Sequence, residues 1–365
     1  MNRLILIGNG FDLAHGLKTS YKDFIHAYLR KAFEEAYTNH SYKDDFITIN
    51  RNPKYIDISG GVSEYLDFYF EKGLKQLINN QPVVDENGQG YNPLFSVHIH
   101  SDFFKRIVTN CINANWVDIE NEFYEDLKQI IYEGDDIRKN AQLKSLNESL
   151  GFIISSLNDY LETIGTKKHI DSYDIIFQSS IKASEIVERF VGTEMRVSKT
   201  LLLNFNYTST IENYYSNENN PAHEINYIHG KLKSQDNPTI FGFGDELDEH
   251  YLKMELEKAK GFFKYIKSFW YFKTSNYYNL IRFIDSMPFQ VFILGHSCGL
   301  SDRTMLNMIF EHENCKSIKI YYHGDKDNNS YAALTEEISR HFKNKAQMRR
   351  KIVSFDKSEP MPQVK

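Results

Sequence analysis

Short apolar runs that alternate with helical stretches dominate the second half of this chain. The runs cover residues 201–205, 225–228, 239–241, 290–294, 318–322 and 351–355, and helical patterns at 246–285, 302–312 and 330–343 separate several of them. Residues 3–7 form another continuous apolar run, typical of a strand buried on both faces. Because strands that alternate with helices favour parallel pairing, we predict an α/β fold. Its core would be a doubly wound, mainly parallel Rossmann-type sheet.

A long segment between the first strand and the later ones has helical periodicity. The pattern extends over about residues 62–191, after a polar, turn-rich stretch at 38–60 that we interpret as a surface connection. Before it, Ser20 and Asp23 have the spacing of a capping box and predict a helix that begins there. We therefore expect a discontinuous Rossmann-like nucleotide-binding domain, residues 1–40 plus 195–365, and a large helical insertion domain, residues 41–194.

The composition excludes several classes of protein. The 365 residues include 43 Lys+Arg and 49 Asp+Glu, a formal charge of −6 that disfavours broad coating of nucleic acid without excluding a local basic patch. Three scattered cysteines are too few for a disulfide framework or a four-cysteine zinc site. No apolar run approaches the ~20 residues that span a bilayer, and the start lacks the features of a signal peptide. We expect a cytoplasmic protein without a membrane partner, a metal site or a tightly bound cofactor.

Four glycine- or histidine-bearing turns directly follow predicted strands, at residues 8–16, 204–208, 229–230 and 295–299. In doubly wound sheets the ligand site lies at the carboxyl ends of the strands, so these turns should meet in one crevice. Gly8-Asn-Gly10 is a fragment of the dinucleotide-binding pattern, with Leu13 where a third glycine is usual. We expect a tight turn there, since glycine accepts positive φ, and backbone N–H groups that cradle a phosphate.

Specific side chains in these turns suggest roles in binding and chemistry. His229 follows a strand end and has a side chain suited to general-base catalysis. Asn206 can hydrogen-bond a ribose hydroxyl or a water molecule. The positions that we assign to nucleotide contact are Gly8, Asn9, Gly10, Phe11, Asp12, His15, Gly295, His296, Ser297 and Asp302.

Two other kinds of site have partial matches in the sequence, a serine-hydrolase nucleophile and an acidic metal site. Residues 295–299, GHSCG, match the Gly-x-Ser-x-Gly elbow of serine hydrolases, with Asp325 and His341 as the downstream partners. His341 falls within a predicted helix, however, so a loop that binds ribose or phosphate is favoured. Asp118 and Glu120 suit a metal, but a solvated acidic turn at a helix start is the favoured interpretation.

Several blocks together resemble the bacteriophage abortive-infection AbiH family. They are LILIGNGFDLAHGLKTSYKDF at 4–24, WVDIE at 116–120, NFNYT at 204–208, YIHG at 227–230, FGFGD at 241–245 and LGHS at 294–297. The resemblance extends from residue 4 to about 302. It implies a bacterial defence protein that limits phage propagation by harming the infected cell, in response to a phage-derived trigger.

The order of the same motifs is also similar to sirtuin-like domains, which bind NAD on a Rossmann-type sheet. By this resemblance Asn206 orients a water or ribose and His229 removes a proton from ribose, while the nucleotide contacts Gly8, Gly10, Gly295 and Ser297. The chain departs from that pattern at residues 205–208, FNYT, where sirtuins have Gln-Asn-x-Asp, and it lacks the paired-cysteine zinc knuckle. Protein deacylation is therefore not expected.

Our leading hypothesis is an effector that cleaves the N-glycosidic bond of NAD or a related nucleotide, with His229 as the base. One alternative is a metal-dependent nuclease or RNA-binding toxin that uses Asp12, Asp118 and Glu120. Another is a non-catalytic nucleotide sensor that recruits a partner. The expected partners are the nucleotide, the phage-derived trigger and a second copy of the chain.

Overall fold

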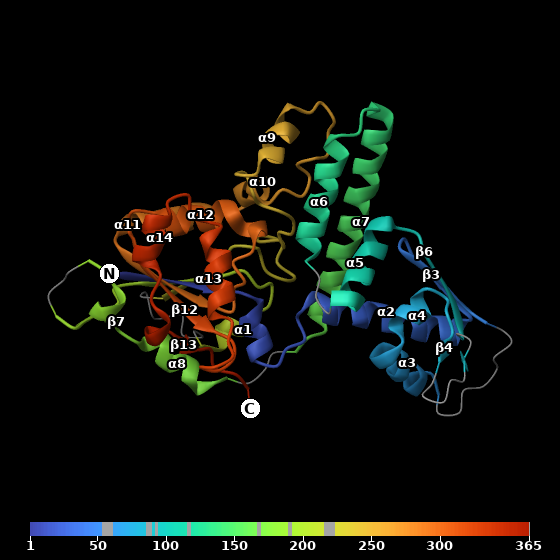
Figure 1. The fold of residues 1–365 in the computed structure, drawn as a ribbon, viewed down its shortest axis with the longest axis horizontal. Coiled ribbons are helices and arrows are strands. Elements are labelled where there is room, and N and C mark those ends of the chain that lie inside the picture. Colours follow the sequence, from blue (N-terminus) through green and yellow to red (C-terminus); the bar gives the residue numbers. More distant parts are fainter. Residues whose placement is uncertain are drawn as a thin grey trace. The chain divides into compact units, whose positions relative to one another are not determined.

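The computed structural model describes residues 1–52, 61–84, 90–91, 94–114, 118–165, 169–188, 192–214 and 223–364. The chain folds into two units (Figure 1). The first, which we call the sheet unit, combines Met1–Thr19 with Leu161–Lys365, and the second, the inserted unit, is Ser20–Tyr160. None of the helices in the described ranges is long and apolar enough to cross a membrane.

A six-stranded parallel sheet forms the centre of the sheet unit. Its order is β10 (His223–Tyr227), β9 (Thr200–Asn204), β1 (Asn2–Ile7), β11 (Phe289–Leu294), β12 (Cys315–Tyr322) and β13 (Glu359–Pro360). Along the chain these are the third, second, first, fourth, fifth and sixth strands, so β1 and β11 meet where the order reverses. Ile5 of β1 pairs with Leu202 on one side and Phe292 on the other. The predicted α/β fold with a parallel sheet is therefore confirmed.

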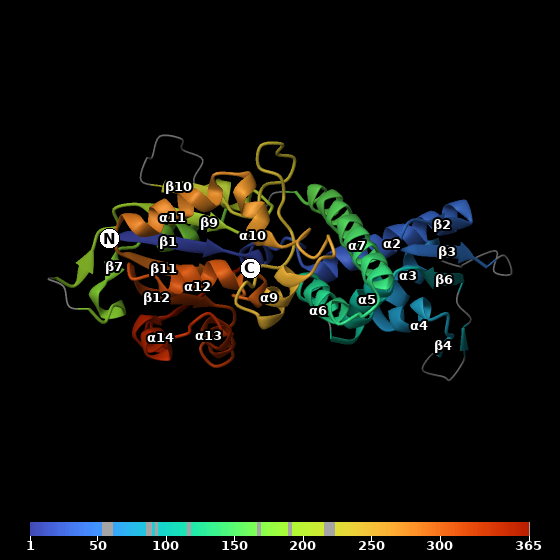
Figure 2. The same ribbon diagram turned by 90° about the horizontal axis from the view of Figure 1, so that it is seen from above.

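Helices cover both faces of this sheet, whose strands β10, β9, β1, β11 and β12 lie side by side in this order in Figure 2. Side chains alternate between the faces of a strand, and in β1 Leu4 and Leu6 pack with α11 (Asn276–Ser286), α12 (Arg303–Glu311) and α13 (Tyr331–Ser339). Ile5 and Ile7 pack with α1 (Asn9–Ala14) and α8 (Asp171–Gln178) on the opposite face. Burial on both sides explains why the strands are continuous apolar runs. The other regular elements of this unit are α9 (Glu249–Leu256), α10 (Lys267–Trp270), α14 (Lys345–Lys351), β7 (Ile181–Lys182) and β8 (Glu194–Met195).

The inserted unit consists of helices and short antiparallel strands. Its helices are α2 (Tyr21–Asn39), α3 (Gly61–Lys72), α4 (Leu74–Ile78), α5 (Asp102–Ala114), α6 (Ile119–Ile131) and α7 (Asp136–Glu162), the last of which ends in the sheet unit. Its strands are β2 (Ser41–Lys43), β3 (Ile47–Arg51) and β6 (Phe95–Ile99), with a small ladder of β4 (Val83–Val84) and β5 (Gly90–Tyr91). The predicted capping box is present, since the Asp23 N–H donates to Ser20 Oγ at 3.1 Å and the Ser20 N–H to Asp23 Oδ2 at 3.2 Å.

Several predicted elements are wrong. The stretch predicted as a surface connection contains β2 and β3, which pair with each other, and β3 also pairs with β6. Its alternating buried Ile47 and Ile49 have the period of a strand despite polar neighbours. Residues 239–241 form no strand, and Ile352 makes only an isolated bridge to Ile318. The predicted helix at 246–285 is broken into α9, α10 and α11, with Gly261 at a φ of 128° between the first two.

The unit boundaries also differ from the expected ones at 40 and 194. Helix α2 lies in the inserted unit. Its Tyr28 ring packs edge-on against Phe104, and its Phe33 ring packs at a tilt against Phe95. Helix α8 lies in the sheet unit, because Tyr173 and Phe177 pack into the core of the sheet. These apolar faces assign each helix to its unit.

The loops that follow β1 and β11 are packed backbone against backbone. The Gly10 N–H donates to the Gly295 carbonyl at 2.8 Å, and a Cβ atom at Gly8 would lie 2.5 Å from the His296 Cα. Neither Gly8 nor Gly10 has a positive φ, contrary to the expected turn; Gly10 already belongs to α1. Glycine is required at these positions by close approach, and positive φ occurs instead at Gly295, at 73°.

Gly295 and Gly16 allow this steric requirement to be measured. Their φ values are 73° and 72°, but a Cβ at Gly295 would lie 2.1 Å from the Phe11 nitrogen, whereas at Gly16 it would meet nothing within 4 Å. Gly16→Ala should cost about 1–2 kcal/mol for the left-handed conformation alone. Gly295→Ala should cost at least about 2 kcal/mol more, because backbone must move. Urea denaturation of both variants measures the difference, and equal losses would contradict the packing argument.

Candidate functional site

Three predicted residues from two strand ends form one buried cluster in the sheet unit. His229 follows β10, whereas His296 and Asp302 lie in the loop after β11; they are 5%, 5% and 7% exposed. His229 Nε2 lies 3.1 Å from Asp302 Oδ1, and His296 Nε2 lies 3.6 Å from Asp302 Oδ2. The ring of Phe205, after β9, packs edge-on against both imidazoles. We call His229, His296, Asp302 and their partner Lys267 the strand-end cluster.

Lys267, which is not among the predicted site residues, completes this cluster. It begins α10, its side chain is fully buried, and its Nζ donates to Asp302 Oδ1 at 2.9 Å. Tyr271 follows on the same segment, with its hydroxyl 3.2 Å from His229 Nε2. Both residues lie in an aromatic- and lysine-rich stretch between strands. Its one available signal was a lysine directly after the apolar Ile266, a pattern too common to mark a site.

The charges in the cluster are balanced by one carboxylate. Burial alone would raise the pKa of Asp302, but the Lys267 ammonium and His229 hold that pKa well below its ordinary value. Burial, reinforced by Lys267, lowers the pKa of His229 to about 4. At neutral pH the cluster therefore contains an ammonium, a carboxylate and a neutral imidazole. A neutral imidazole hydrogen-bonded to a carboxylate is the arrangement that a general base requires.

Asn206 and the glycine turn connect the loops around this cluster. Asn206 Nδ2 donates to the Gly8 carbonyl at 3.0 Å, which ties the loop after β9 to the loop after β1. The Gly10 and Phe11 N–H groups donate to the Gly295 and Gly8 carbonyls. These two amides are thus used within the protein, and not directed at a phosphate. Asn9 is exposed and accepts a hydrogen bond from Thr19.

Asp12 lies beside a small cavity at the ends of β9 and β10. It is 1% exposed, accepts a hydrogen bond from Thr208 Oγ1 at 2.5 Å, and has no partner for its Oδ1. Burial raises its pKa to about 6. The cavity, of about 170 Å³, is lined by Thr208 and by Tyr207, Thr210 and Lys231 among others. Asp12 is thus a carboxyl group with a pKa suited to acid–base chemistry, one side chain from a cavity.

Phe11 and His15 lie in the apolar core between α1 and α8. Phe11 is fully buried and packs on Tyr173. His15 Nδ1 donates to the Phe11 carbonyl at 2.7 Å, and its Nε2 accepts from the Tyr214 hydroxyl at 2.6 Å. Both ring nitrogens are therefore engaged within the core.

The Gly-x-Ser-x-Gly segment does not assemble a hydrolase triad in the described residues. Ser297 is exposed, and the strained left-handed position belongs to its neighbour Cys298, at a φ of 56°. His341 donates to the Cys298 carbonyl at 2.7 Å, whereas Asp325 accepts backbone N–H groups of its own turn. The structure thus gives the serine-hydrolase interpretation no support.

The acids considered for a metal site are not gathered either. Asp118 caps α6, as the sequence predicts for an acidic helix start, and Glu120 is buried in its first turn. Both belong to the inserted unit, whereas Asp12 belongs to the sheet unit. Within the described ranges, one group has ligand atoms close enough for a metal ion, His169, Asp171 and Asp174, and it was not predicted.

These observations define an α/β protein whose central parallel sheet carries a polar cluster at its strand ends. A family model described as "Bacteriophage abortive infection AbiH" matches residues 4–323, so most of the chain is covered. The chain belongs to the AbiH family, so the AbiH resemblance is confirmed, whereas the sirtuin-like resemblance is not. No curated protein and no solved structure matches it significantly.

Removing one charge from the strand-end cluster should destabilise the fold. Asp302→Asn leaves the Lys267 ammonium buried without its counterion, which costs about 3–5 kcal/mol. In the double variant Asp302→Asn/Lys267→Met, neither charge remains and much of the loss should be recovered. Asp325→Asn, at an exposed turn, should stay within about 0.5 kcal/mol of wild type. Urea denaturation of wild type, both single variants and the double variant measures the coupling between Asp302 and Lys267. Losses of the two single variants that simply add up in the double variant would contradict the pairing.

The buried neutral His229 should make the fold sensitive to acid. Because its folded pKa of about 4 lies below its ordinary value of 6.5, only the unfolded chain binds this proton between these pH values. The contribution of neutral His229 to the free energy of unfolding is therefore present above pH 6.5. It is lost as the pH falls, by about 2 kcal/mol between pH 7 and 5. We compare wild type with His229→Gln. The raised pKa of Asp12 acts in the opposite direction, but Asp12 is present in both proteins. In urea denaturation His229→Gln should lose less unfolding free energy than wild type between pH 7 and 5; an equal loss would contradict the assignment.

Proposed function

We propose that this AbiH-family protein is an abortive-infection effector that binds and cleaves a nucleotide such as NAD at the strand-end cluster. Family membership indicates a function in phage abortive infection. The chemistry is our inference from the site. The single observation that carries it is the buried pair of neutral His229 and ionised Asp302 at the strand ends.

The sheet topology supports a nucleotide as the ligand. Its strand order, three-two-one-four-five-six along the chain, is the order of Rossmann-type dinucleotide-binding domains. We therefore classify the sheet unit as Rossmann-type and doubly wound. In such sheets the ligand lies where the order reverses, which is here between β1 and β11, next to Gly8 and Gly295.

The geometry suits hydrolysis of an N-glycosidic bond. With its Nε2–H directed at Asp302, His229 has a lone pair on Nδ1 that can accept a proton from water. The water oxygen forms a bond to the anomeric carbon of ribose, the bond to the base breaks, and its electron pair leaves with the base as nicotinamide. Asp302 stabilises the resulting imidazolium. We assign to Asn206, after β9, the orientation of the water or ribose.

A second candidate is a non-catalytic nucleotide sensor that recruits a partner. The observation that favours it is the burial of the cluster, since His229 is 5% exposed and its Nε2 is bonded to Asp302 and Tyr271. A sensor would bind a nucleotide tightly, and its toxicity in cells would be unchanged by His229→Ala. An effector would lose its toxicity with the same substitution.

The direct test is release of nicotinamide from NAD by the purified full-length protein, with and without lysate of phage-infected cells. His229→Ala should reduce the rate by about 10²–10⁴-fold, the contribution of a general base. The matched control is His312→Ala, since His312 also pairs with a carboxylate, Asp285 at 3.1 Å, but lies beyond the C-terminal end of α12. No turnover by wild type under either condition, or equal rates for both variants, would refute NAD cleavage by His229.

A further inference from the structure

A cavity of about 320 Å³ lies beside α12 and α13 in the sheet unit, and none of its lining residues belongs to the strand-end cluster. Its polar lining consists of Arg303, Asn307, Arg340, His341, Lys343 and Lys345. Four of these side chains are cationic, and the lining in the described part of the chain includes no carboxylate. A concave site lined by one sign of charge concentrates ligands of the opposite sign.

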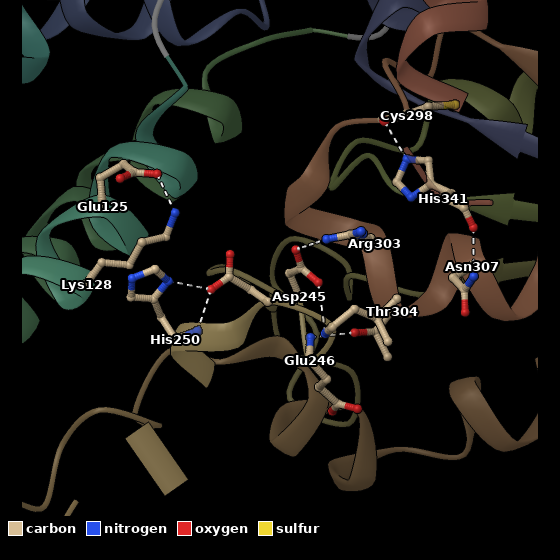
Figure 3. Close-up of polar contacts among 12 residues, drawn as sticks. Glu125, Lys128, Asp245, Glu246, His250, Cys298, Arg303, Thr304, Asn307 and His341 are labelled. Carbon is tan, nitrogen blue, oxygen red and sulfur yellow. Dashed lines mark hydrogen bonds and ion pairs between the residues drawn. The ribbon is translucent and has the colours of Figure 1, made fainter. Parts of the chain in front are cut away.

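Two buried polar atoms of the lining have no partner within the protein. His341 is 1% exposed; its Nε2–H donates to the Cys298 carbonyl at 2.7 Å, which leaves its buried Nδ1 unpaired (Figure 3). Arg303 donates from Nη1 to Asp245 Oδ2 at 2.9 Å, and its buried Nε is unpaired. Unpaired buried polar atoms are energetically costly and rare in folded proteins. Both side chains line the cavity, so a ligand there is a candidate partner for each atom.

The surrounding charges leave the cavity net positive. Arg303 and Arg340 are balanced in part by Asp245 and Glu337, which lie outside the lining. Lys343 and Lys345 are exposed; Lys345 donates to the backbone carbonyl of Ser339, and the Glu311 carboxylate lies near Lys343. The four lining cations therefore outnumber the neighbouring carboxylates, Asp245, Glu337 and Glu311, and an anion in the cavity would meet the exposed ammonium groups of Lys343 and Lys345.

His341 adds a second requirement on the ligand. Burial lowers its pKa to about 4, so its imidazole is neutral at pH 7. Since Nε2 carries the proton that bonds to Cys298, Nδ1 can only accept a hydrogen bond. The dianion of a phosphate monoester has no proton to donate to it, whereas a hydroxyl or amino group elsewhere on the molecule does.

We propose that this cavity binds a small phosphorylated molecule that also carries a hydroxyl or amino donor, in the size range of a nucleoside monophosphate. The phosphate would bond to Arg303 Nε and lie near Lys343 and Lys345, while the donor bonds to His341 Nδ1. A volume of about 320 Å³ is within the range of small-molecule sites. Binding of this ligand does not require NAD cleavage, because the lining residues do not include His229 or Asp302.

The cavity and the strand-end cluster are connected by hydrogen bonds through one loop. His341 donates to the Cys298 carbonyl, the Cys298 N–H donates to His296 Nδ1 at 2.9 Å, and His296 Nε2 faces Asp302. Arg303 follows Asp302 directly. A ligand that reorients His341 would therefore act on the loop that holds the cluster.

The test is isothermal titration calorimetry of the full-length protein with AMP, adenosine and inorganic phosphate. AMP should bind at least about tenfold more tightly than either fragment, because it satisfies both the cations and His341. Lys343→Gln should weaken AMP binding about threefold to fivefold. Arg350→Gln, the same change of charge at an exposed residue of α14 outside the lining, should not. His341→Phe keeps an aromatic ring but has no ring nitrogen that can accept, so it should reduce the preference for AMP over phosphate.

Three outcomes would overturn the proposal. They are no AMP binding at millimolar concentration, equal weakening by Lys343→Gln and Arg350→Gln, and AMP binding that His229→Gln abolishes while Lys343→Gln leaves it intact. The last result would place the nucleotide at the strand-end cluster and so support the proposed function instead. Failure of NAD cleavage would not affect the AMP measurement.

Discussion

The contact between the backbones of the loops after β1 and β11 is the constraint on which the site depends. Gly8 and Gly10 allow the first loop to contact Gly295 and the backbone of His296. The Gly10 N–H also donates a hydrogen bond to the Gly295 carbonyl. The second loop continues from there to Asp302. A side chain at any of the three glycines would separate the loops. The positions of His296 and Asp302 in the second loop therefore depend on three residues that have no side chain.

Within this frame, burial and the buried Lys267–Asp302 ion pair set the protonation state of His229. Asp302 accepts hydrogen bonds from Lys267 and His229, and the ammonium beside it makes a second positive charge on His229 unfavourable. The tautomer of His296 is also fixed, because its Nδ1 accepts the Cys298 N–H. The sheet thus positions not only the side chains but also their protons. Such fixed protonation states are what acid–base chemistry and selective binding both require.

The parts of the structure predicted from the sequence are those with local signals. Strands β1, β9, β11 and β12 are buried on both faces, so they are mostly continuous apolar runs. The residues just after β9 and the half-buried β10 include Asn206 and His229. Lys267 escaped prediction because its role comes from long-range packing with Asp302. Strand β13 is two exposed residues, Glu359 and Pro360, without any apolar pattern. Phe11 and His15 lie in a motif but serve the core.

The inserted unit leaves and re-enters the sheet unit through the wall of the cavity near Asp12. The chain passes Leu17 shortly before the inserted unit begins at Ser20, and it returns at Leu161 and Glu162; all three of these sheet-unit residues line that cavity. The inserted unit has no other covalent attachment. Both crossings of the chain between the units therefore lie in the wall of this cavity, so the shape of one cavity constrains the backbone on each side of the insertion.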